Sequence, residues 1–186
     1  MQGLLIALYA GSLMTIFLLA ACSSPFTTYS RYMSEGQRYW KLKEYEQARK
    51  AFLMAYEAEK GVVPLAWAAS ASYWLNDLTG AETYIRQAEP GARTSVCYFR
   101  VTGYKALLLL RQGKKDEGLV VLKEYARAYG ITYPSRNLPL IDLMINKGDA
   151  DIQKLEAMLE EDIYAYEQEI EQFNRTGTGY FDKRGS

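Results

Sequence analysis

Apolar residues recur every three or four positions along most of the chain after residue 29, and the segments that carry them follow one another in pairs. This spacing predicts amphipathic helices rather than strands. Short breaks separate the two segments of each pair, and those of the second, third and fourth pairs contain Gly, Asn or Asp. The predicted helices are residues 30–41 and 44–58, 65–75 and 79–88, 95–111 and 115–129, and 138–146 and 149–173. Because similar pairs follow at similar spacing, the chain is predicted to be all-α and built from helical repeats.

The first pair carries a specific pattern, which reads Gly36-x2-Tyr39-x5-Tyr45-x2-Ala48-x3-Phe52-x2-Ala55. This pattern resembles the tetratricopeptide repeat (TPR), which places small residues such as Gly36 and Ala48 where two helices approach closely. In the second pair, Ala81 follows Ala48 after 33 residues, close to the 34-residue period of that repeat. The third pair keeps the turn at residues 112–117 but has Gly118 where alanine is expected. The resemblance implies a TPR-like helical-hairpin solenoid of three to four helix pairs with a long C-terminal helix, over residues 29–173. An irregular α-helical bundle is the alternative.

Repeat proteins of this kind bind peptides or protein segments on a concave surface, which is formed by the first helix of each pair. The resemblance therefore implies a candidate groove that consists of Met33, Gln37, Trp40, Lys41, Trp67, Ser70, Tyr73, Trp74, Arg100, Tyr104 and Arg111. All three tryptophans of the chain belong to this set, and Trp, Tyr and Arg dominate the energetics of binding interfaces. The alternative is that these aromatic residues fill the core or lie beneath the C-terminal helix.

The distribution of charge along the chain bears on how the last predicted helix packs. Lys plus Arg and Asp plus Glu both number 22, so nothing in the net charge points to nucleic acid. However, residues 93–136 carry nine basic residues against three acidic ones, whereas residues 149–171 carry nine acidic residues against Lys154 alone. The last predicted helix also has an apolar stripe, from Ile152 to Phe173, that must be buried somewhere. Its acidic face is either solvated, docked on the basic third pair of the same chain, or docked on a basic partner.

The chain opens with an uncharged apolar run, residues 4–21, that ends in Leu19-Ala20-Ala21-Cys22. This ending resembles the lipobox of bacterial lipoproteins, in which the signal peptide, here residues 1–21, is removed and the cysteine, here Cys22, is acylated. The resemblance implies a membrane-anchored, periplasm-facing protein, and Ser23 after the cysteine favours the outer membrane. Residues 22–28 are then a linker, and residues 174–186 a flexible tail. An uncleaved transmembrane anchor or a buried helix of the fold is the alternative.

The composition argues against an enzyme. The chain has no histidine, which is the commonest general base and metal ligand, and we identify no catalytic residue, metal site or cofactor site. Cys97 lies in an apolar stretch and is expected to be a buried thiol. We therefore expect a non-catalytic adaptor for a protein partner in envelope, secretion or pilus assembly, similar to lipoproteins such as pilotins. The alternatives are a periplasmic receptor that holds a peptide or small ligand in an aromatic groove, and a lipid-anchored enzyme, which the missing histidine disfavours.

Overall fold

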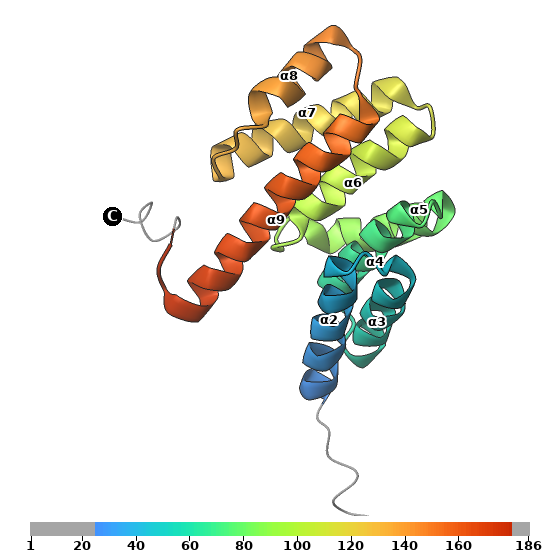
Figure 1. The fold of residues 1–186 in the computed structure, drawn as a ribbon, viewed down its shortest axis with the longest axis vertical. Helices are drawn as coiled ribbons and strands as arrows, with labels where there is room; N and C mark the ends of the chain where they lie inside the picture. The colour runs from blue at the N-terminus through green and yellow to red at the C-terminus, as the bar shows by residue number, and fades with distance from the viewer. Residues whose placement is uncertain (1–24, 180–186) are drawn as a thin grey trace, which may run out of the picture.

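The computed structural model describes residues 25–179, and within this range the chain is all-α, as predicted (Figure 1). The helices are α2 (Pro25–Lys41), α3 (Tyr45–Ala58), α4 (Val62–Trp74), α5 (Leu78–Ala92), α6 (Tyr98–Arg111), α7 (Lys115–Thr132), α8 (Leu138–Lys147) and α9 (Ile152–Thr176). None of these helices is long and apolar enough to cross a membrane. The proposed signal peptide, Cys22 and the end of the tail lie outside the described residues.

The turns between paired helices share one backbone geometry. A residue in the left-handed region ends the first helix of each pair, and it is Lys43, Asn76, Gly113 or Gly148. The residue that follows it donates its N–H to a carbonyl five positions earlier, as Asp77 does to Ser72 at 2.9 Å. This bond satisfies a carbonyl that the end of a helix would leave unpaired. The predicted breaks between paired segments are therefore confirmed.

Small residues allow the paired helices to pack closely, as the sequence predicted. Gly36 of α2 lies against the ring of Phe52 in α3, and a β-carbon at Gly36 would collide with that ring. Ala48 is completely buried in the same cluster. In the third pair, a β-carbon at Gly118 would lie 2.8 Å from Leu110 Cγ, which explains why glycine replaces the expected alanine.

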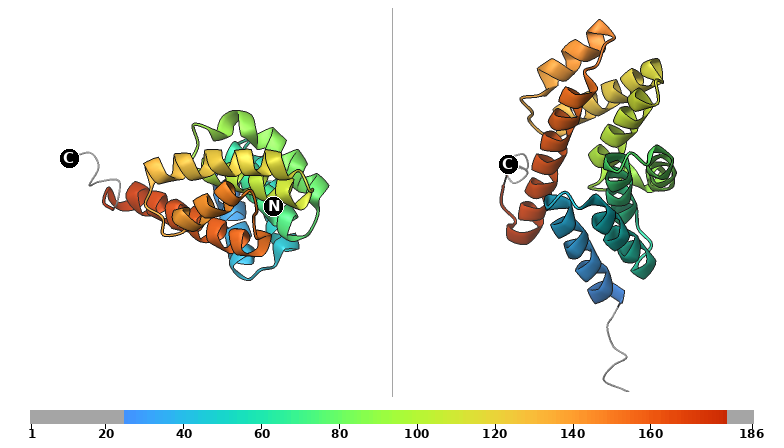
Figure 2. Two further views of the ribbon diagram at one scale, coloured as in Figure 1. Left: turned by 90° about the horizontal axis from the view of Figure 1, so that it is seen from above. Right: turned by 45° about the vertical axis from the view of Figure 1, so that its right-hand side comes forward.

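Helix α9 does not stack on α8 as the second helix of another hairpin. Its main backbone neighbour is α6, which it crosses, and its C-terminal part extends toward α2 (Figures 1 and 2). The apolar residues Leu155, Leu159 and Ile163 of α9 are fully buried in the larger core cluster. This helix therefore completes the core of the second and third pairs instead of only covering the end of the molecule.

Several helix boundaries differ from the prediction by one to five residues, among them the start of α2 and both ends of α9. Helix α2 begins at Pro25, inside the stretch expected to be a linker, because proline is well suited to the first turn of a helix. Helix α9 begins at Ile152, since the Asp151 side chain accepts a hydrogen bond from the N–H of Lys154 and caps the helix there. The same helix continues to Thr176, because Gly177 adopts the left-handed conformation that ends it.

Candidate functional site

The eleven residues predicted for the groove come from α2, α4 and α6, but most of them are not open to solvent. Only Lys41 is exposed, whereas Gln37, Trp40, Trp74 and Arg111 are partly buried. The remaining six are buried, namely Met33, Trp67, Ser70, Tyr73, Arg100 and Tyr104. The part of the surface formed by α4 and α6 is covered by α9, which is the covering that the sequence left open as an alternative.

Three carboxylates of α9 explain how it is held there. Glu156, Glu160 and Glu167 are spaced by four and seven residues, which places them on one face of a helix. Glu156 accepts hydrogen bonds from Tyr73 Oη at 2.5 Å and from Arg111 Nη2 at 2.7 Å. Of the three alternatives left open for the acidic helix, the structure therefore shows docking on the basic third pair of its own chain, through Arg111 and Arg100 of α6.

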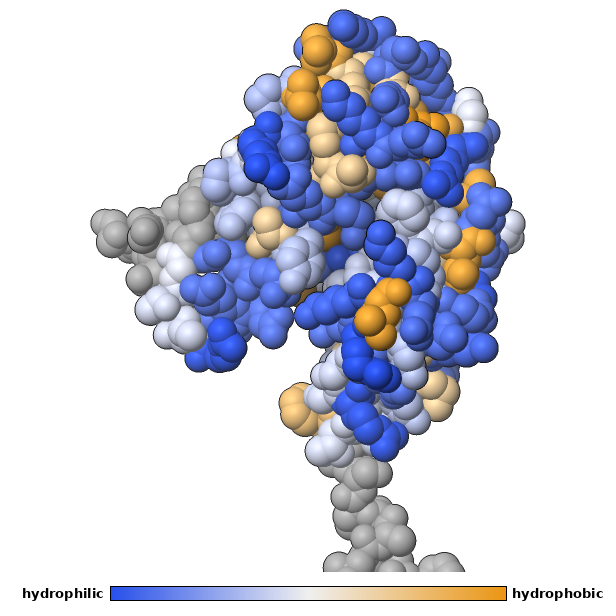
Figure 3. Space-filling view, viewed as in Figure 1, coloured by the Kyte–Doolittle hydropathy of each residue, from blue (hydrophilic) through white to orange (hydrophobic). Residues whose placement is uncertain are grey.

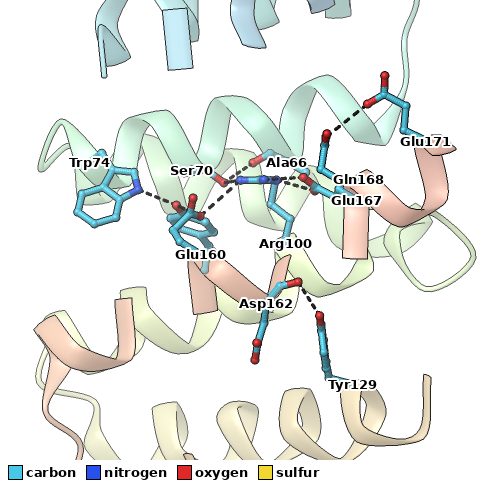
Figure 4. A network of polar contacts seen from close by, with 11 residues as sticks. Ala66, Ser70, Trp74, Arg100, Tyr129, Glu160, Asp162, Glu167, Gln168 and Glu171 are labelled. Atoms are coloured by element: carbon cyan, nitrogen blue, oxygen red, sulfur yellow. Dashed lines mark hydrogen bonds and ion pairs between the residues drawn. The ribbon is translucent and has the colours of Figure 1, made fainter. Parts of the chain in front are cut away.

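Arg100 is the centre of this interface (Figure 4). Its guanidinium donates to both carboxylate oxygens of Glu167, at 2.8 and 2.7 Å, and only 1 % of the residue is exposed. It also lies 3.6 Å from the ring centroid of Trp67 and 5.4 Å from that of Trp40. Burial by itself would lower the pKa of this guanidinium, but the charge and hydrogen bonds of Glu167 raise it overall. Arg100 is therefore a buried cation whose charge α9 neutralises.

Glu160 lies in a chain of hydrogen bonds beside Arg100. The indole N–H of Trp74 donates to Tyr104 Oη at 2.6 Å, and Tyr104 Oη donates to Glu160 at 2.5 Å. Glu160 is also 3.6 Å from Arg100 Nη1. Burial raises the pKa of Glu160, although Arg100 and Tyr104 oppose that shift. Tyr104 and Trp74 are thus bonded to other groups of the chain instead of being presented to a partner.

Asp162 is a buried acid whose role the sequence did not reveal. It accepts hydrogen bonds from Ser135 Oγ at 2.8 Å and from Asn137 Nδ2 at 2.9 Å. Burial raises its pKa, and these two donors act in the opposite direction. These bonds attach α9 to the loop before α8. Ser135 and Asn137 follow a proline in a predicted loop, which indicated a turn but no bonding partner.

A cleft of about 610 Å³ remains open between α2, α4 and the C-terminal half of α9. Four predicted groove residues line it, namely Gln37, Trp40, Lys41 and Trp67. Figure 3 shows the hollow between α2 and the end of α9. The opposite wall comes from α9 and consists of Tyr164, Glu167, Gln168, Ile170, Glu171, Asn174 and Arg175. The sequence did not assign these α9 residues to the groove, although the amphipathic stripe already placed Ile170 on an apolar face.

Val63, Val96 and Cys97 also line the cleft. Cys97 is a free thiol, and it is buried as predicted. Burial raises its pKa, which a hydrogen bond to Ser95 opposes, so the thiolate form is disfavoured. The lining of the cleft as a whole therefore combines aromatic and aliphatic side chains, such as Trp40 and Trp67, with polar side chains such as Gln37 and Gln168.

Comparison with protein-family models, with curated proteins and with solved structures finds no match for this chain.

Proposed function

We propose that this protein is a lipid-anchored, non-catalytic adaptor of the bacterial envelope, with a TPR-like solenoid of three helical hairpins followed by α8 and α9. It binds a segment of a protein partner in the cleft between α2 and the C-terminal half of α9. The proposal places the protein on the periplasmic side of the outer membrane, held by acylated Cys22, in secretion, pilus or other envelope assembly.

The aromatic floor of the cleft is the observation that carries the proposal. Trp40 and Trp67 meet edge to face there, with ring centroids 5.3 Å apart, and both line the open cleft. Large aromatic residues in a concave site are the usual anchors of protein binding. Gln37, Gln168 and Asn174 lie around the floor, and their amides can both donate to and accept from the backbone of a bound segment.

Two cations of the cleft are available to a partner. Lys41 lies on the α2 side and Arg175 on the α9 side, and neither forms a salt bridge within residues 25–179. Their charges can therefore attract acidic groups of a partner without first breaking a salt bridge to the part of the chain that the structure describes.

The proposed anchor is consistent with the position of the cleft. Helix α2 has 17 residues, which span about 25 Å at the usual rise of an α-helix. Cys22 precedes this helix by three residues, and the cleft lies at its far end. A partner segment that reaches within a few nanometres of the bilayer could therefore enter the cleft.

A small-ligand receptor is the second candidate, because a volume of about 610 Å³ falls within the range of small-molecule sites. The open side of the cleft in Figure 3 favours a longer segment of chain. Cross-linking distinguishes the two candidates, since only a protein partner would produce an adduct of much higher mass.

The test is photo-cross-linking in cells that express the full chain. A photoreactive amino acid replaces Gln37 in the cleft or, as a control, Gln87, which is exposed on α5. We expect a discrete adduct with an envelope protein from position 37 alone. Lys41→Glu should weaken this adduct, whereas Lys50→Glu, a charge reversal on the exposed part of α3, should not. No adduct at position 37, or the same adduct at both positions, would contradict the proposal.

A further inference from the structure

The C-terminal half of α9 differs from its N-terminal half in how it is held. The last buried residue of α9 is Ile163. Beyond it, Tyr164 is 46 % exposed, and Ile170 and Phe173, the end of the apolar stripe, are only partly buried. Its contacts with the body include the Glu167–Arg100 ion pair and the ring of Tyr166, which lies 4.7, 6.3 and 6.2 Å from the rings of Phe99, Tyr129 and Tyr133, but no residue of this half is buried. Residues 164–176, called here the arm, are therefore the part of α9 that can leave at least cost.

We infer that the arm is displaceable, and that the partner of the cleft is an acidic amphipathic helix that replaces it and presents a carboxylate to Arg100 in place of Glu167. This inference rests on the proposed function, because the partner uses the wall of the same cleft that α2 and α4 form with Gln37, Trp40, Lys41 and Trp67, and this wall stays in place when the arm leaves. It adds the chemical class of the partner and a competition between the partner and the chain's own arm.

The surroundings of Arg100 explain why the group that the partner presents to it must be a carboxylate. The guanidinium lies over Trp67 and donates to Ser70 Oγ at 3.3 Å, and both residues belong to α4, which does not move with the arm. A buried cation that loses its anion is strongly disfavoured. Glu160 remains near Arg100 when the arm leaves, but its carboxylate lies 3.6 Å from Arg100 Nη1. It does not form the two short hydrogen bonds that Glu167 forms with the guanidinium. A planar carboxylate restores those bonds because it matches the paired donors of arginine.

The arm itself shows that a helix fits this place. It presents Glu167 to Arg100, and Ile170, three residues later, to the cleft. A helix with a carboxylate and an apolar residue at this spacing would make the same contacts, as in other helix-in-groove complexes. Trp40 and Trp67 lie in the floor of the cleft and also next to Arg100. The cleft and the Arg100 site would therefore form one continuous surface when the arm leaves.

The connection of the arm to the rest of the chain controls the affinity for a partner. A tethered competitor acts at a high effective concentration, so the native chain should bind an external helix weakly. A change that weakens the arm alone should strengthen binding of the external helix, since the open form becomes more populated.

The experiment uses the purified full chain in detergent and, as probe, a fluorescent peptide with the sequence of residues 164–176. Fluorescence anisotropy measures the Kd of the peptide. We expect Glu167→Gln in the protein to strengthen binding about tenfold, which corresponds to about 1.4 kcal/mol. The matched control is Glu161→Gln in the protein, because Glu161 is on α9 but pairs with exposed Arg136. A peptide that itself carries Glu167→Gln should bind neither protein.

A second variant keeps the test independent of charge. Tyr166→Ala in the protein removes the ring contacts of the arm with Phe99, Tyr129 and Tyr133 and leaves Arg100 and Glu167 unchanged. It should also strengthen binding of the native peptide. Equal peptide affinity for the native, Glu167→Gln and Glu161→Gln proteins would overturn the inference. So would dimerisation of Glu167→Gln, measured by sedimentation, because a second copy would then be the occupant.

The peptide-binding experiment and the cross-linking experiment can fail independently, so they test the displaceable arm and the proposed function separately. If the arm variants leave the peptide affinity unchanged while position 37 still gives its adduct, the cleft binds a partner but the arm does not compete with it. If position 37 gives no adduct while Glu167→Gln strengthens binding of the peptide, the arm is displaceable but the cleft does not serve an envelope partner.

Discussion

Arg100 and Glu167, which are 67 residues apart in the sequence, form a two-bond ion pair that joins α6 to the second half of α9. The pair lies against Trp67 and beside the open cleft. It links the core of the third helical pair to the wall of the candidate binding site, so substitutions in it should affect both stability and binding.

Replacement of Arg100 by Met should destabilise the fold by about 3 kcal/mol, because removing one partner of a buried ion pair leaves the other without compensation. Here the carboxylates of Glu160 and Glu167 would both lose their cation. Urea unfolding gives the free energy. Arg136→Met, which removes an exposed ion pair with Glu161, is the control and should cost less than about 1 kcal/mol. Equal losses for the two variants would mean that the Arg100 pair contributes no more than a surface pair.

The stability of the protein should depend on the protonation of Glu160. Its pKa is raised from the ordinary 4.5 because it is buried. The folded chain therefore binds the proton more readily than the unfolded chain, and the contribution of Glu160 to stability is fully present below pH 4.5 and is lost as the pH rises through the raised pKa. The difference in unfolding free energy between native protein and Glu160→Gln should thus shift in favour of the native protein on acidification from pH 7.

Urea titrations at a series of pH values would measure this difference. Glu161→Gln is the control, since Glu161 is exposed on the same helix. A difference between native protein and Glu160→Gln that is constant with pH would show that the proton affinity of Glu160 is the same in the folded and unfolded chains.

Ala48→Leu should overpack the contact between α2 and α3 and cost about 1–3 kcal/mol. Ala48 is 0 % exposed and belongs to the cluster that contains Phe52, so an added isobutyl group has no free space. Gln47→Leu places the same side chain at an exposed neighbouring position and should change stability by less than about 0.5 kcal/mol. Thermal or urea unfolding compares the two variants, and similar values for both would contradict the close approach at Ala48.

Cys22→Ala should abolish acylation and leave the precursor uncleaved, because the lipobox-like ending requires that cysteine. Labelling of cells with a fatty-acid analogue measures acylation, and the change in mass measures cleavage. Cys97→Ala is the matched control, since Cys97 is buried in the fold, and it should be labelled like the native protein. Labelling of Cys22→Ala at the native level would exclude acylation at this position and, with it, the proposed anchor.

Part of the candidate site followed from the helical register. Gln37, Trp40, Lys41 and Trp67 were predicted to line a groove and do line the cleft. In contrast, Tyr73, Arg100 and Tyr104 occupy the same register positions but are buried beneath α9. The repeat register predicts which residues of a helix lie on the same face. It does not predict which helix, distant in the sequence, covers that face. The α9 wall of the cleft could not be predicted for the same reason.

The sequence by itself determined the helices and the turns between them. The spacing of apolar residues over a few turns is enough to predict a helix. Residues such as Asn76 and Gly113, which tolerate the left-handed conformation, end helices through interactions with residues close in the sequence. Gly36 and Ala48 likewise indicated a close crossing between neighbours in sequence. Only the tertiary structure decided where α9 lies. An amphipathic stripe must be buried, but it does not specify the surface that buries it. The position of α9 depends on three contacts between residues far apart in the sequence, which join Glu156 to Arg111, Glu160 to Tyr104 and Glu167 to Arg100.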